Sequence, residues 1–460
     1  MKRFASFLPG ALVLMTASPG VAAENRSPGD EEVRQLIRDG VEKQHRAPGI
    51  VVGLTDTNGP RVLSHGRVGR DATNAVGADT VFEIGSTTKA FTALLLAIMA
   101  ERGDVKPDEA AAGLLPKSVK LPSRGGREIT LRHLATHTSA LPRLPGNFKP
   151  ADPDNPYADY TVAQMYAFLP NCELRRDIGE KYEYSNLGAG LLGHLLALKA
   201  GTNYEALVLR EICGPLKLTD TGITLTPGMK ARLARGHNAA GVPVKNWDLP
   251  TLAGAGALRS TADDMLKFLA ANLGLVRSPL SNAMEQTHAA QHEAGTAGNE
   301  IALGWHVRKK PDSTFVWHNG GTGGYHSFAG FDTSRRRGVV VLANSANDID
   351  DIGWHLLDAR FEVRVPRIRQ AAGIDHRVYA DYAGRYQLPS GSVFVITRDG
   401  DRLLAKLAEQ PTLEIHPESE TKFFYTVVDA QLTFVRDQAG AVTHLVLHQN
   451  GLDQKATRVR

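Results

Sequence analysis

A serine and a lysine stand three residues apart in FEIGSTTKAFTALLLAIMAERGD, the segment from Phe82 to Asp104. A serine hydroxyl is a weak nucleophile at neutral pH, and it needs a neighbour that accepts its proton. If a helix begins at Thr87, Ser86 and Lys89 share one face and their side chains can touch. Lys89 can accept a proton only where burial or nearby donors lower its pKa. The alternative is that Ser86 caps the helix and Lys89 is an exposed lysine of the first turn.

Two later motifs favour the catalytic interpretation. Tyr184 and Asn186 stand directly before a second apolar helical pattern, in GEKYEYSNLGAGLLGHLLA. The strand-like run VWHNGGTGGYHSFAGFD contains His318, Gly320 and Gly321. Serine–lysine acyl transferases use three elements in this order: the serine–lysine pair, a second proton carrier beside an amide, and a glycine-rich strand. The three motifs together predict a nucleophilic serine.

Composition limits the classes of protein that fit. With 460 residues the chain can form two folded units, and 42% hydrophobic and 22% charged residues are ordinary for a soluble globular protein. The net charge is +4, and no long basic run interleaves with aromatic residues, so nucleic acid is not a predicted partner. Small molecules and peptides remain as substrates.

The pattern along the chain predicts an α/β or α+β core. A helical opening at 30–47 precedes two strands around the Asn58-Gly59 turn, which indicates a hairpin. Residues 86–275 are mostly helical patterns, and strand-like runs return at 303–310, 313–321, 325–332 and 338–345. The middle of the chain is therefore predicted to be a helical insertion between two halves of one sheet.

From about Tyr379 onward, short alternating runs are separated by Asp-Gly, Ala-Gly and Asn-Gly turns. This pattern predicts a small antiparallel module, a closed or nearly closed β-barrel. We expect a hydrolase domain over residues 24–365 and the barrel domain over residues 376–460.

The N-terminus predicts export. Residues 1–23 have two basic residues, an apolar stretch and the small residues Val21-Ala22-Ala23, as in a cleaved signal peptide. A retained anchor is the alternative, and the expected location is periplasmic or secreted. Cys172 and Cys213 are the two cysteines of the chain, either bridged or buried as free thiols.

With these motifs the chain resembles the serine β-lactamase and penicillin-binding-protein family, in its branch of class C β-lactamases, D-Ala-D-Ala carboxypeptidases and esterases, peptidase family S12. The resemblance runs from Val33 to Phe361 and includes ITLRHLATHTSALP and GALRSTADDMLKFL. It implies an antiparallel sheet flanked by helices, with a helical lobe beside it and the active site between them. The C-terminal module is similar to a lipocalin-like barrel that some members append.

The resemblance also implies roles for the motif residues. Ser86 would be acylated, while Lys89 and Tyr184 would share the roles of general base and acid. Asn186 would orient the substrate amide and hydrogen-bond Lys89. The backbone NH groups of Ser86 and Gly321 would form the oxyanion hole. No metal or organic cofactor is expected.

One motif departs from the β-lactamase pattern, because His318-Asn319-Gly320 stands where those enzymes carry Lys-Thr-Gly. A lysine there is a cation for a substrate carboxylate, whereas a histidine with a pKa near 6.5 is mostly neutral at pH 7. If His318 contacts an anionic group, KM should rise as pH passes about 6.5; the alternative is a neutral imidazole. Asn344 is a weaker candidate for a carboxylate contact, and a loop-capping role is its alternative.

Other signals predict no further site. His133 with His137, and His288 with His292, have the spacing of helical zinc ligands, but neither pair has the adjoining Glu of the zinc motif. The run GGTGG lacks the Lys-Ser/Thr that follows in a phosphate loop.

Three functions remain open. The first is an exported serine hydrolase acting on D-amino-acid peptide amides or β-lactams. The second is an esterase using the same residues. The third is a non-catalytic protein that binds muropeptides or β-lactams, which the intact serine, lysine and tyrosine disfavour.

Overall fold

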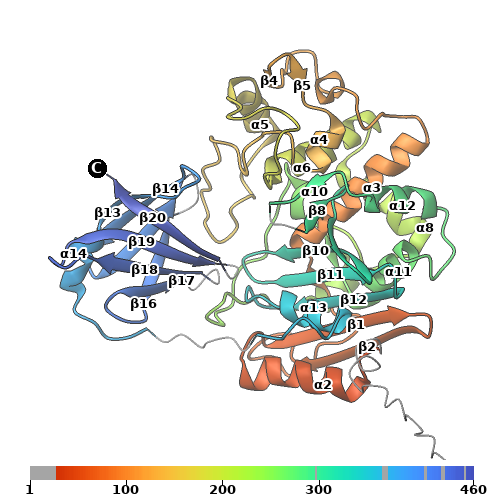
Figure 1. The fold of residues 1–460 in the computed structure, drawn as a ribbon. Helices are drawn as coiled ribbons and strands as arrows, with labels where there is room; N and C mark the ends of the chain where they lie inside the picture. Colours follow the sequence, from red (N-terminus) through yellow and green to blue (C-terminus); the bar gives the residue numbers. More distant parts are fainter. Residues whose placement is uncertain are drawn as a thin grey trace, which may run out of the picture.

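The computed structural model describes residues 27–295, 298–364, 371–408, 412–425, 430–449 and 452–459. The predicted signal peptide, residues 1–23, lies outside the described residues. Figure 1 shows a body built on a central sheet, with a β-barrel at the C-terminal end of the chain, drawn in blue.

The central sheet joins two strands from the beginning of the described chain with six strands that follow the helical middle. Its order is β2-β1-β12-β11-β10-β9-β8-β7, and every neighbouring pair is antiparallel. Its strands are β1 (Gly49–Asp56), β2 (Gly59–Gly66), β7 (His292–Glu293), β8 (Asn299–Ile301), β9 (His306–Lys310), β10 (Ser313–Gly321), β11 (His326–Asp332) and β12 (Arg337–Ala343). Because β1 pairs with β12, the predicted split of one sheet around a helical insertion is confirmed.

The turn between β1 and β2 follows from its sequence. Gly59 has a φ of 103°, which favours glycine, and the Asp56 carboxylate accepts a hydrogen bond from the Asn58 NH at 2.7 Å. Asp56 faces Gly59 in the register, so the predicted hairpin is confirmed.

Helices cover both faces of the sheet, which explains why β1 is apolar along its length. On one face, Ile50 and Val52 belong to the same buried cluster as Val33 of α2 (Asp30–Arg38) and residues of α13 (Asp350–Leu357). On the other face, a side chain at Gly53 would lie 2.9 Å from Leu266 of α11 (Ala262–Asn272), so glycine allows close packing there.

The middle of the chain is helical, as predicted. Its helices are η2 (Gly85–Thr87), α3 (Thr88–Glu101), η3 (Ala111–Leu114), α4 (Leu131–Ala135), α5 (Val162–Phe168), η4 (Leu169–Asn171), α6 (Asn186–Lys199), α7 (Tyr204–Val208), η5 (Leu209–Cys213), α8 (Gly214–Leu216), α9 (Pro227–Ala231), α10 (Ala253–Gly256), α11 and α12 (Ser281–His288). Two small two-stranded sheets accompany these helices: β3 (Phe82–Glu83) pairs with β6 (Arg259–Ser260), and β4 (Ser123–Arg124) pairs with β5 (Arg127–Glu128). Almost every residue of α3 and α6 is buried, so both are core helices and not amphipathic surface helices.

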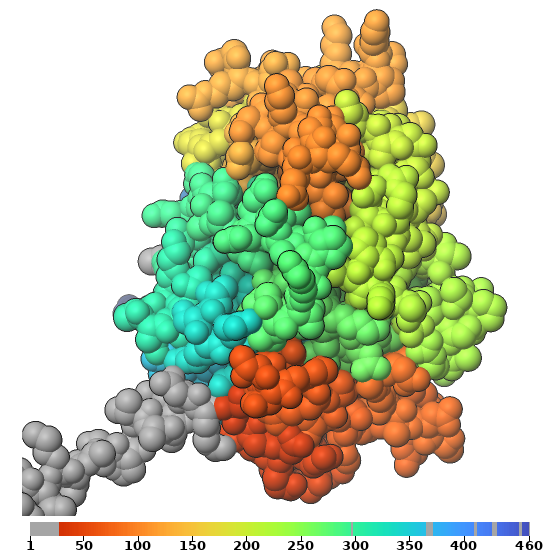
Figure 2. Space-filling model, turned by 90° about the vertical axis from the view of Figure 1, so that its right-hand side faces the viewer, coloured from red at the N-terminus to blue at the C-terminus, as the bar shows by residue number. Residues whose placement is uncertain are grey.

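Segments far apart in the sequence form one continuous surface. On the face in Figure 2, the N-terminal segment (red), the helical middle of the chain (orange to green) and the returning strands (cyan) lie against one another.

The helical opening differs in one detail from the expectation, because α2 passes into a wider turn, η1 (Asp39–Lys43).

The C-terminal module is a closed antiparallel barrel, as predicted. Its strands are β13 (Gly384–Gln387), β14 (Val393–Asp399), β15 (Arg402–Leu407), β16 (Leu413–Pro417), β17 (Lys422–Tyr425), β18 (Ala430–Arg436), β19 (Val442–Gln449) and β20 (Leu452–Val459), and β13 pairs with β20 to close it. The module begins with two short helices, η6 (His376–Val378) and α14 (Tyr379–Tyr382), which precede the first barrel strand. Tyr382 packs its ring on Phe434, so the barrel core holds this helix.

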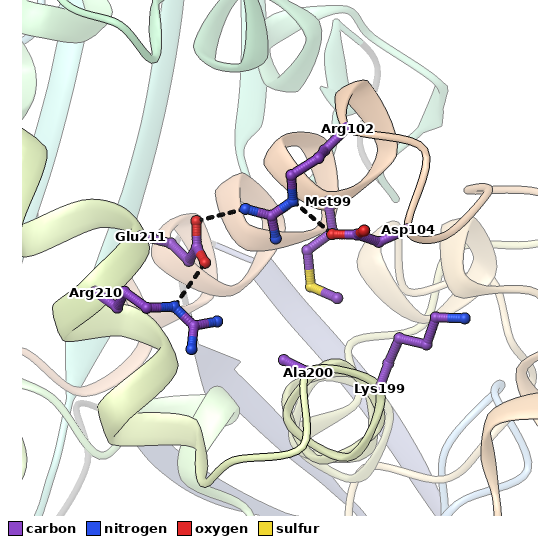
Figure 3. Close-up of a pocket in the computed structure, with 7 residues that line it drawn as sticks. All are labelled: Met99, Arg102, Asp104, Lys199, Ala200, Arg210 and Glu211. Atoms are coloured by element: carbon purple, nitrogen blue, oxygen red, sulfur yellow. Dashed lines mark hydrogen bonds and ion pairs between the residues drawn. The ribbon is translucent and has the colours of Figure 1, made fainter.

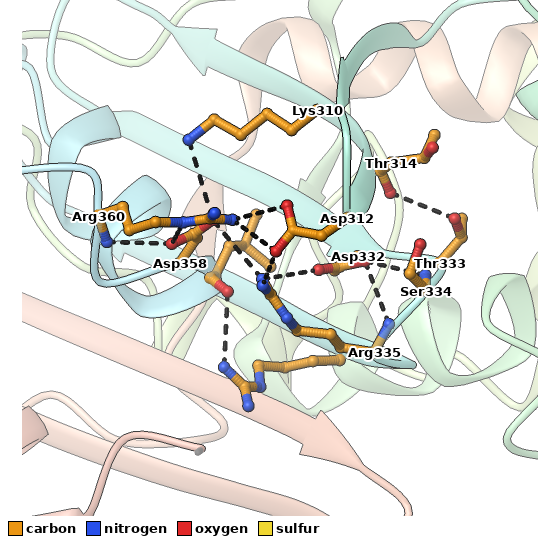
Figure 4. A network of polar contacts seen from close by, with 11 residues as sticks. Lys310, Asp312, Thr314, Asp332, Thr333, Ser334, Arg335, Asp358 and Arg360 are labelled. Atoms are coloured by element: carbon orange, nitrogen blue, oxygen red, sulfur yellow. Dashed lines mark hydrogen bonds and ion pairs between the residues drawn. The ribbon is translucent and has the colours of Figure 1, made fainter. Parts of the chain in front are cut away.

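A network of charges ties the sheet turns to the end of α13 (Figure 4). Asp358, whose side chain has no exposed surface, pairs with Arg360 at 2.6 Å, and Arg335 lies 3.5 Å away. Burial alone would raise the pKa of Asp358, but the hydrogen bonds from Arg360 outweigh it and lower the pKa to about 2. The ionised carboxylate is therefore favoured in the folded state.

We expect Asp358→Asn to lower the free energy of unfolding by about 2 kcal/mol at pH 7, because it removes the buried anion that Arg360 and Arg335 share and leaves them only their other carboxylate partners. The folded pKa lies below the unfolded value of about 3.9, so this contribution is complete above that pH and is lost as pH falls towards about 2. Urea unfolding at pH 7 and at pH 3 should show the difference from wild type narrowing in acid. Asp312→Asn is the matched control, since Asp312 joins the same network with a half-exposed side chain. If both variants lose the same free energy of unfolding, Asp358 does not stabilise the network more than its other carboxylates do.

Candidate active site

Ser86 lies in the tight turn that leads into α3. The turn η2 continues directly into α3, and the Ser86 side chain is partly exposed. The Ser327 hydroxyl of β11 donates to the Ile84 carbonyl at 2.8 Å and contacts the Thr87 hydroxyl at 3.0 Å. The sheet therefore fixes the turn that presents the serine.

Lys89 is buried, with 2% of its surface exposed, and three oxygens surround its Nζ. They are Ser86 Oγ at 3.0 Å, Asn186 Oδ1 at 3.0 Å and the Ala255 carbonyl at 2.6 Å. Burial, with a smaller effect from the charge of Arg143, lowers the pKa of Lys89 well below its usual value. A neutral amine has two N–H donors and one lone pair; the two carbonyl oxygens take the donors, and the lone pair is left for the serine hydroxyl.

Tyr184 has the opposite electrostatic situation. Burial raises its pKa to about 12, although a hydrogen bond with Ser86 and the charge of Arg143 lower it in part. Its ring centroid lies 4.7 Å from Lys89 Nζ. The lowered pKa of Lys89 and the raised pKa of Tyr184 thus favour a neutral amine and a protonated phenol around one serine hydroxyl. Two neighbouring groups whose pKa values are pushed in opposite directions are suited to act as base and acid.

Asn186 is the first residue of α6, and the start of that helix orients it. The Ser185 hydroxyl caps the helix by accepting a hydrogen bond from the Gly188 NH at 2.8 Å. The Asn186 amide donates from Nδ2 to the Tyr157 hydroxyl at 3.2 Å, and its Oδ1 faces Lys89. This contact defines which amide atom is the oxygen.

The end of β10 lies directly against the serine turn. A Cβ added to Gly320 would lie 1.9 Å from the Ile84 carbonyl oxygen and 2.7 Å from the Ser86 nitrogen. A Cβ on Gly85 would lie 2.8 Å from the Gly321 nitrogen. Glycine at both positions therefore brings the peptide groups of Ser86 and Gly321 close together, as an oxyanion hole requires.

The surroundings of His318 bear on the two alternatives for its role. It is 1% exposed, and its ring centroid lies 5.2 Å from that of His306 and 6.4 Å from that of Tyr184. Burial, then the charges of His306 and Lys89, lower its pKa well below the usual 6.5. Its Nδ1 donates to the Asn319 carbonyl at 2.6 Å, so the neutral ring presents Nε2 as an acceptor. The arrangement favours the neutral imidazole over a carboxylate-binding cation that titrates near pH 6.5.

Asn344 and the histidine pairs have structural contacts. Asn344 accepts from the Gly49 NH at 2.8 Å and donates to the Arg67 carbonyl at 3.2 Å, which fits its loop-capping alternative. His137 lies beyond the end of α4, and His292 lies in β7 while His288 ends α12, so neither pair shares one helix.

The two cysteines are free and buried, which confirms the free-thiol alternative. Within the described ranges one group of possible metal ligands has its atoms within 4.8 Å of one another: His326, Asp348 and Asp350. His326 Nε2 contacts Asp350 at 2.9 Å, and Asn319 donates to the same carboxylate at 2.5 Å, so the group is satisfied by its own hydrogen bonds.

Sequence reasoning missed residues that hold Tyr184 in place. His137 accepts a hydrogen bond from the Ser185 NH at 3.2 Å, and its ring lies 4.6 Å from that of Tyr184. Arg143 also contacts this ring: its guanidinium carbon lies 5.0 Å from the Tyr184 ring centroid. Both residues belong to the segment THTSALPR, and the position of this segment before Tyr184 was the one sequence feature that could have indicated their role.

A pocket of about 400 Å³ lies elsewhere, at the ends of α3 and α6 (Figure 3). Ion pairs fill its wall: Arg102 with Asp104 at 2.6 Å and with Glu211 at 2.9 Å, and Arg210 with Glu211 at 2.8 Å. Neither Ser86, Lys89 nor Tyr184 lines it, so this pocket is separate from the candidate site.

The order and geometry of these motifs agree with comparisons to known proteins. Residues 33–360 match the family model described as Beta-lactamase. The chain belongs to the β-lactamase family. It is thus a serine hydrolase, and the predicted family and fold are confirmed. Residues 369–459, which include the barrel strands, match a domain of unknown function, DUF3471.

Relatives within this family carry different activities in their names. A β-lactamase of Lysobacter lactamgenus is 26% identical and covers 71% of this chain and 89% of its own length. The D-alanyl-D-alanine-carboxypeptidase/endopeptidase AmpH of Escherichia coli is 29% identical, over 64% of this chain and 79% of its own. Among solved structures, a class C β-lactamase from Rhodobacter sphaeroides has a TM-score of 0.61 at 25% identity, over 69% of this chain and 95% of that one.

The contact between β10 and the serine turn yields a prediction for this β-lactamase-family site. Gly320→Ala should slow acylation by a fluorophosphonate about 100-fold, because the added methyl group must displace the Ser86 NH or the strand. Gly321→Ala is the control, since a Cβ there meets no atom within 4 Å, and it should stay within a few-fold of wild type. Both rates are measured by gel fluorescence after circular dichroism has verified folding. Equal rates for wild type and Gly320→Ala would refute the close contact.

Proposed function

We propose that the chain is an exported serine hydrolase that transfers an acyl group from a D-amino-acid peptide amide or a β-lactam to Ser86 and then hydrolyses the acyl-enzyme. The observation that carries this proposal is the buried amine of Lys89, 3.0 Å from both Ser86 Oγ and Asn186 Oδ1. A non-catalytic binding protein would have no need for a desolvated lysine beside a partly exposed serine.

In the first half of the reaction, the Ser86 oxygen attacks the substrate carbonyl carbon while its proton passes to Lys89 Nζ. The NH groups of Ser86 and Gly321 stabilise the negative carbonyl oxygen of the tetrahedral intermediate. The C–N or C–O bond then breaks, and the leaving amine or alkoxide takes a proton from Tyr184, which Lys89 can reprotonate. The product is an ester on Ser86.

In the second half, water attacks the ester carbonyl and Ser86 regains its proton as the acid is released. Tyr184 and Lys89 serve as proton carriers in reverse order, by microscopic reversibility. Asn186 holds the substrate amide through its Nδ2 and holds Lys89 through its Oδ1. The chemistry requires only side chains, backbone amides and water.

Two observations bear on the substrate class. The names of relatives include both β-lactamases and a D-alanyl-D-alanine carboxypeptidase. The neutral, acceptor-presenting His318 stands where β-lactamases carry a lysine, so this strand supplies no cation for a substrate carboxylate, which disfavours fast β-lactam hydrolysis. The same observation favours a second candidate, an esterase, because the binding of a neutral ester does not depend on a cation at that position.

The location of the protein rests on residues 1–23, which have the pattern of a cleaved export signal. Over the part of the chain that the structure describes, no helix has the length and apolarity needed to cross a bilayer. A periplasmic or secreted hydrolase with peptide or small-molecule substrates is the consistent proposal.

Covalent labelling tests the nucleophile. A fluorescent penicillin and a fluorophosphonate should both label wild-type protein, and Ser86→Ala should be unlabelled by either, because the attacking oxygen is gone. Thr87→Ala, one residue along the same turn, is the control for the turn itself. Turnover of nitrocefin, a D-Ala-D-Ala peptide and p-nitrophenyl butyrate then ranks the substrate classes. Labelling that persists in Ser86→Ala would place the nucleophile elsewhere.

A further inference from the structure

Arg143 is fixed beside the candidate site by its own backbone. Its carbonyl accepts hydrogen bonds from the NH groups of Asn186 at 3.0 Å and Leu187 at 3.1 Å, at the start of α6. The preceding carbonyl, of Pro142, accepts from the Ser185 hydroxyl at 2.7 Å. The loop that carries Arg143 is therefore anchored to the same helix start as Asn186, and this anchor does not use the arginine side chain.

The guanidinium of Arg143 lies against the Tyr184 ring. Its central carbon lies 5.0 Å from the ring centroid, and the side chain is exposed. Among the residues that the structure describes, no carboxylate lies within ion-pair distance of it. An arginine is charged at every physiological pH, and an unpaired one at a reaction site is available to an anion from solution.

The other basic groups of the site are not suited to hold an anion. Lys89 is buried, and its three polar contacts are already defined. His318 presents an acceptor nitrogen, as described above. Arg143 is thus a permanent cation beside the Tyr184 ring. Its charge also reaches buried groups: burial raises the pKa of Tyr157 and lowers that of His137, and Arg143 adds a smaller lowering effect to both.

We propose that Arg143 determines substrate specificity by binding a carboxylate group of the substrate beside Ser86 and Tyr184. The inference rests on the proposed acyl transfer at Ser86 and adds the substrate class, acyl donors that carry an anionic group. Arg143 would then supply the cation for anionic substrates. It lies on the loop that follows α4, whereas His318 lies on β10.

A second role for Arg143 predicts different kinetics. If its guanidinium only positions Tyr184 through the ring contact, removing it should lower kcat for every substrate, whatever the charge. If it binds a carboxylate, the loss should appear in KM for anionic substrates alone. The comparison needs substrate pairs that differ in charge and share the reacting bond.

The experiment compares p-nitrophenyl esters of N-succinylglycine and N-acetylglycine, which place or omit a carboxylate on the acyl side. A second pair, 3-(butyryloxy)benzoate and 3-nitrophenyl butyrate, places or omits it on the leaving group. Each substrate is tested with wild type, Arg143→Ala, Arg143→Lys and Lys149→Ala. Lys149 is an exposed cation on the same loop, so its variant controls for the general charge of that surface.

We expect Arg143→Ala to raise KM about tenfold or more for at least one carboxylate-bearing ester, with KM for its neutral partner unchanged within twofold. Arg143→Lys should recover part of the loss, and added salt should raise the same KM in wild type but not in Arg143→Ala. Which pair responds identifies the side of the substrate that carries the anion. Equal changes for charged and neutral esters, or no change in any, would overturn the proposal. Failure of the acyl transfer itself is recognised separately, because Ser86→Ala would then hydrolyse all four esters.

Discussion

The burial of one amine organises the catalytic region. Lys89 lies within hydrogen-bonding distance of a serine, an asparagine and a backbone carbonyl that come from three separate segments: the turn η2, the start of α6 and α10. A buried ammonium is costly, and the neutral amine is the form that this environment favours. In the proposed mechanism, the close packing of the core helices would therefore let Lys89 act as a base, which a lysine in water could not do.

The sheet contributes the second half of the arrangement. Strand β10 reaches the serine turn because Gly320 and Gly85 have no side chains to separate the two backbones. A neutral His318 on the same strand adds no positive charge that would stabilise an ionised Tyr184. Positive charge enters instead from Arg143 on an exposed loop, where water lowers its cost. The buried part of the site is therefore nearly uncharged, and the cation lies at its exposed side.

Short motifs were enough to predict the family, the split sheet and the residues that the structure brings together, because Ser86, Lys89, Tyr184 and His318 lie at element ends with strong local signals. The Ala255 carbonyl and Arg143 could not be found, since a backbone oxygen has no sequence signature and an exposed arginine is usually a solvated surface residue. The same limit applies to the short helix α14, which local sequence did not predict and which the barrel core holds through the stacking of Tyr382 on Phe434.

The account depends most on Lys89 being a neutral amine at neutral pH. The acylation rate constant for a neutral chromogenic ester, measured by stopped flow from pH 5 to pH 10, tests this directly. With the pKa of Lys89 lowered well below its usual value by burial, the rate should rise through one ionisation and become level before pH 10. Tyr184, with a pKa of about 12, remains protonated across this range and adds no second rise. A rate that continues to increase up to pH 10 would mean that Lys89 is an ordinary ammonium, and it would contradict the account.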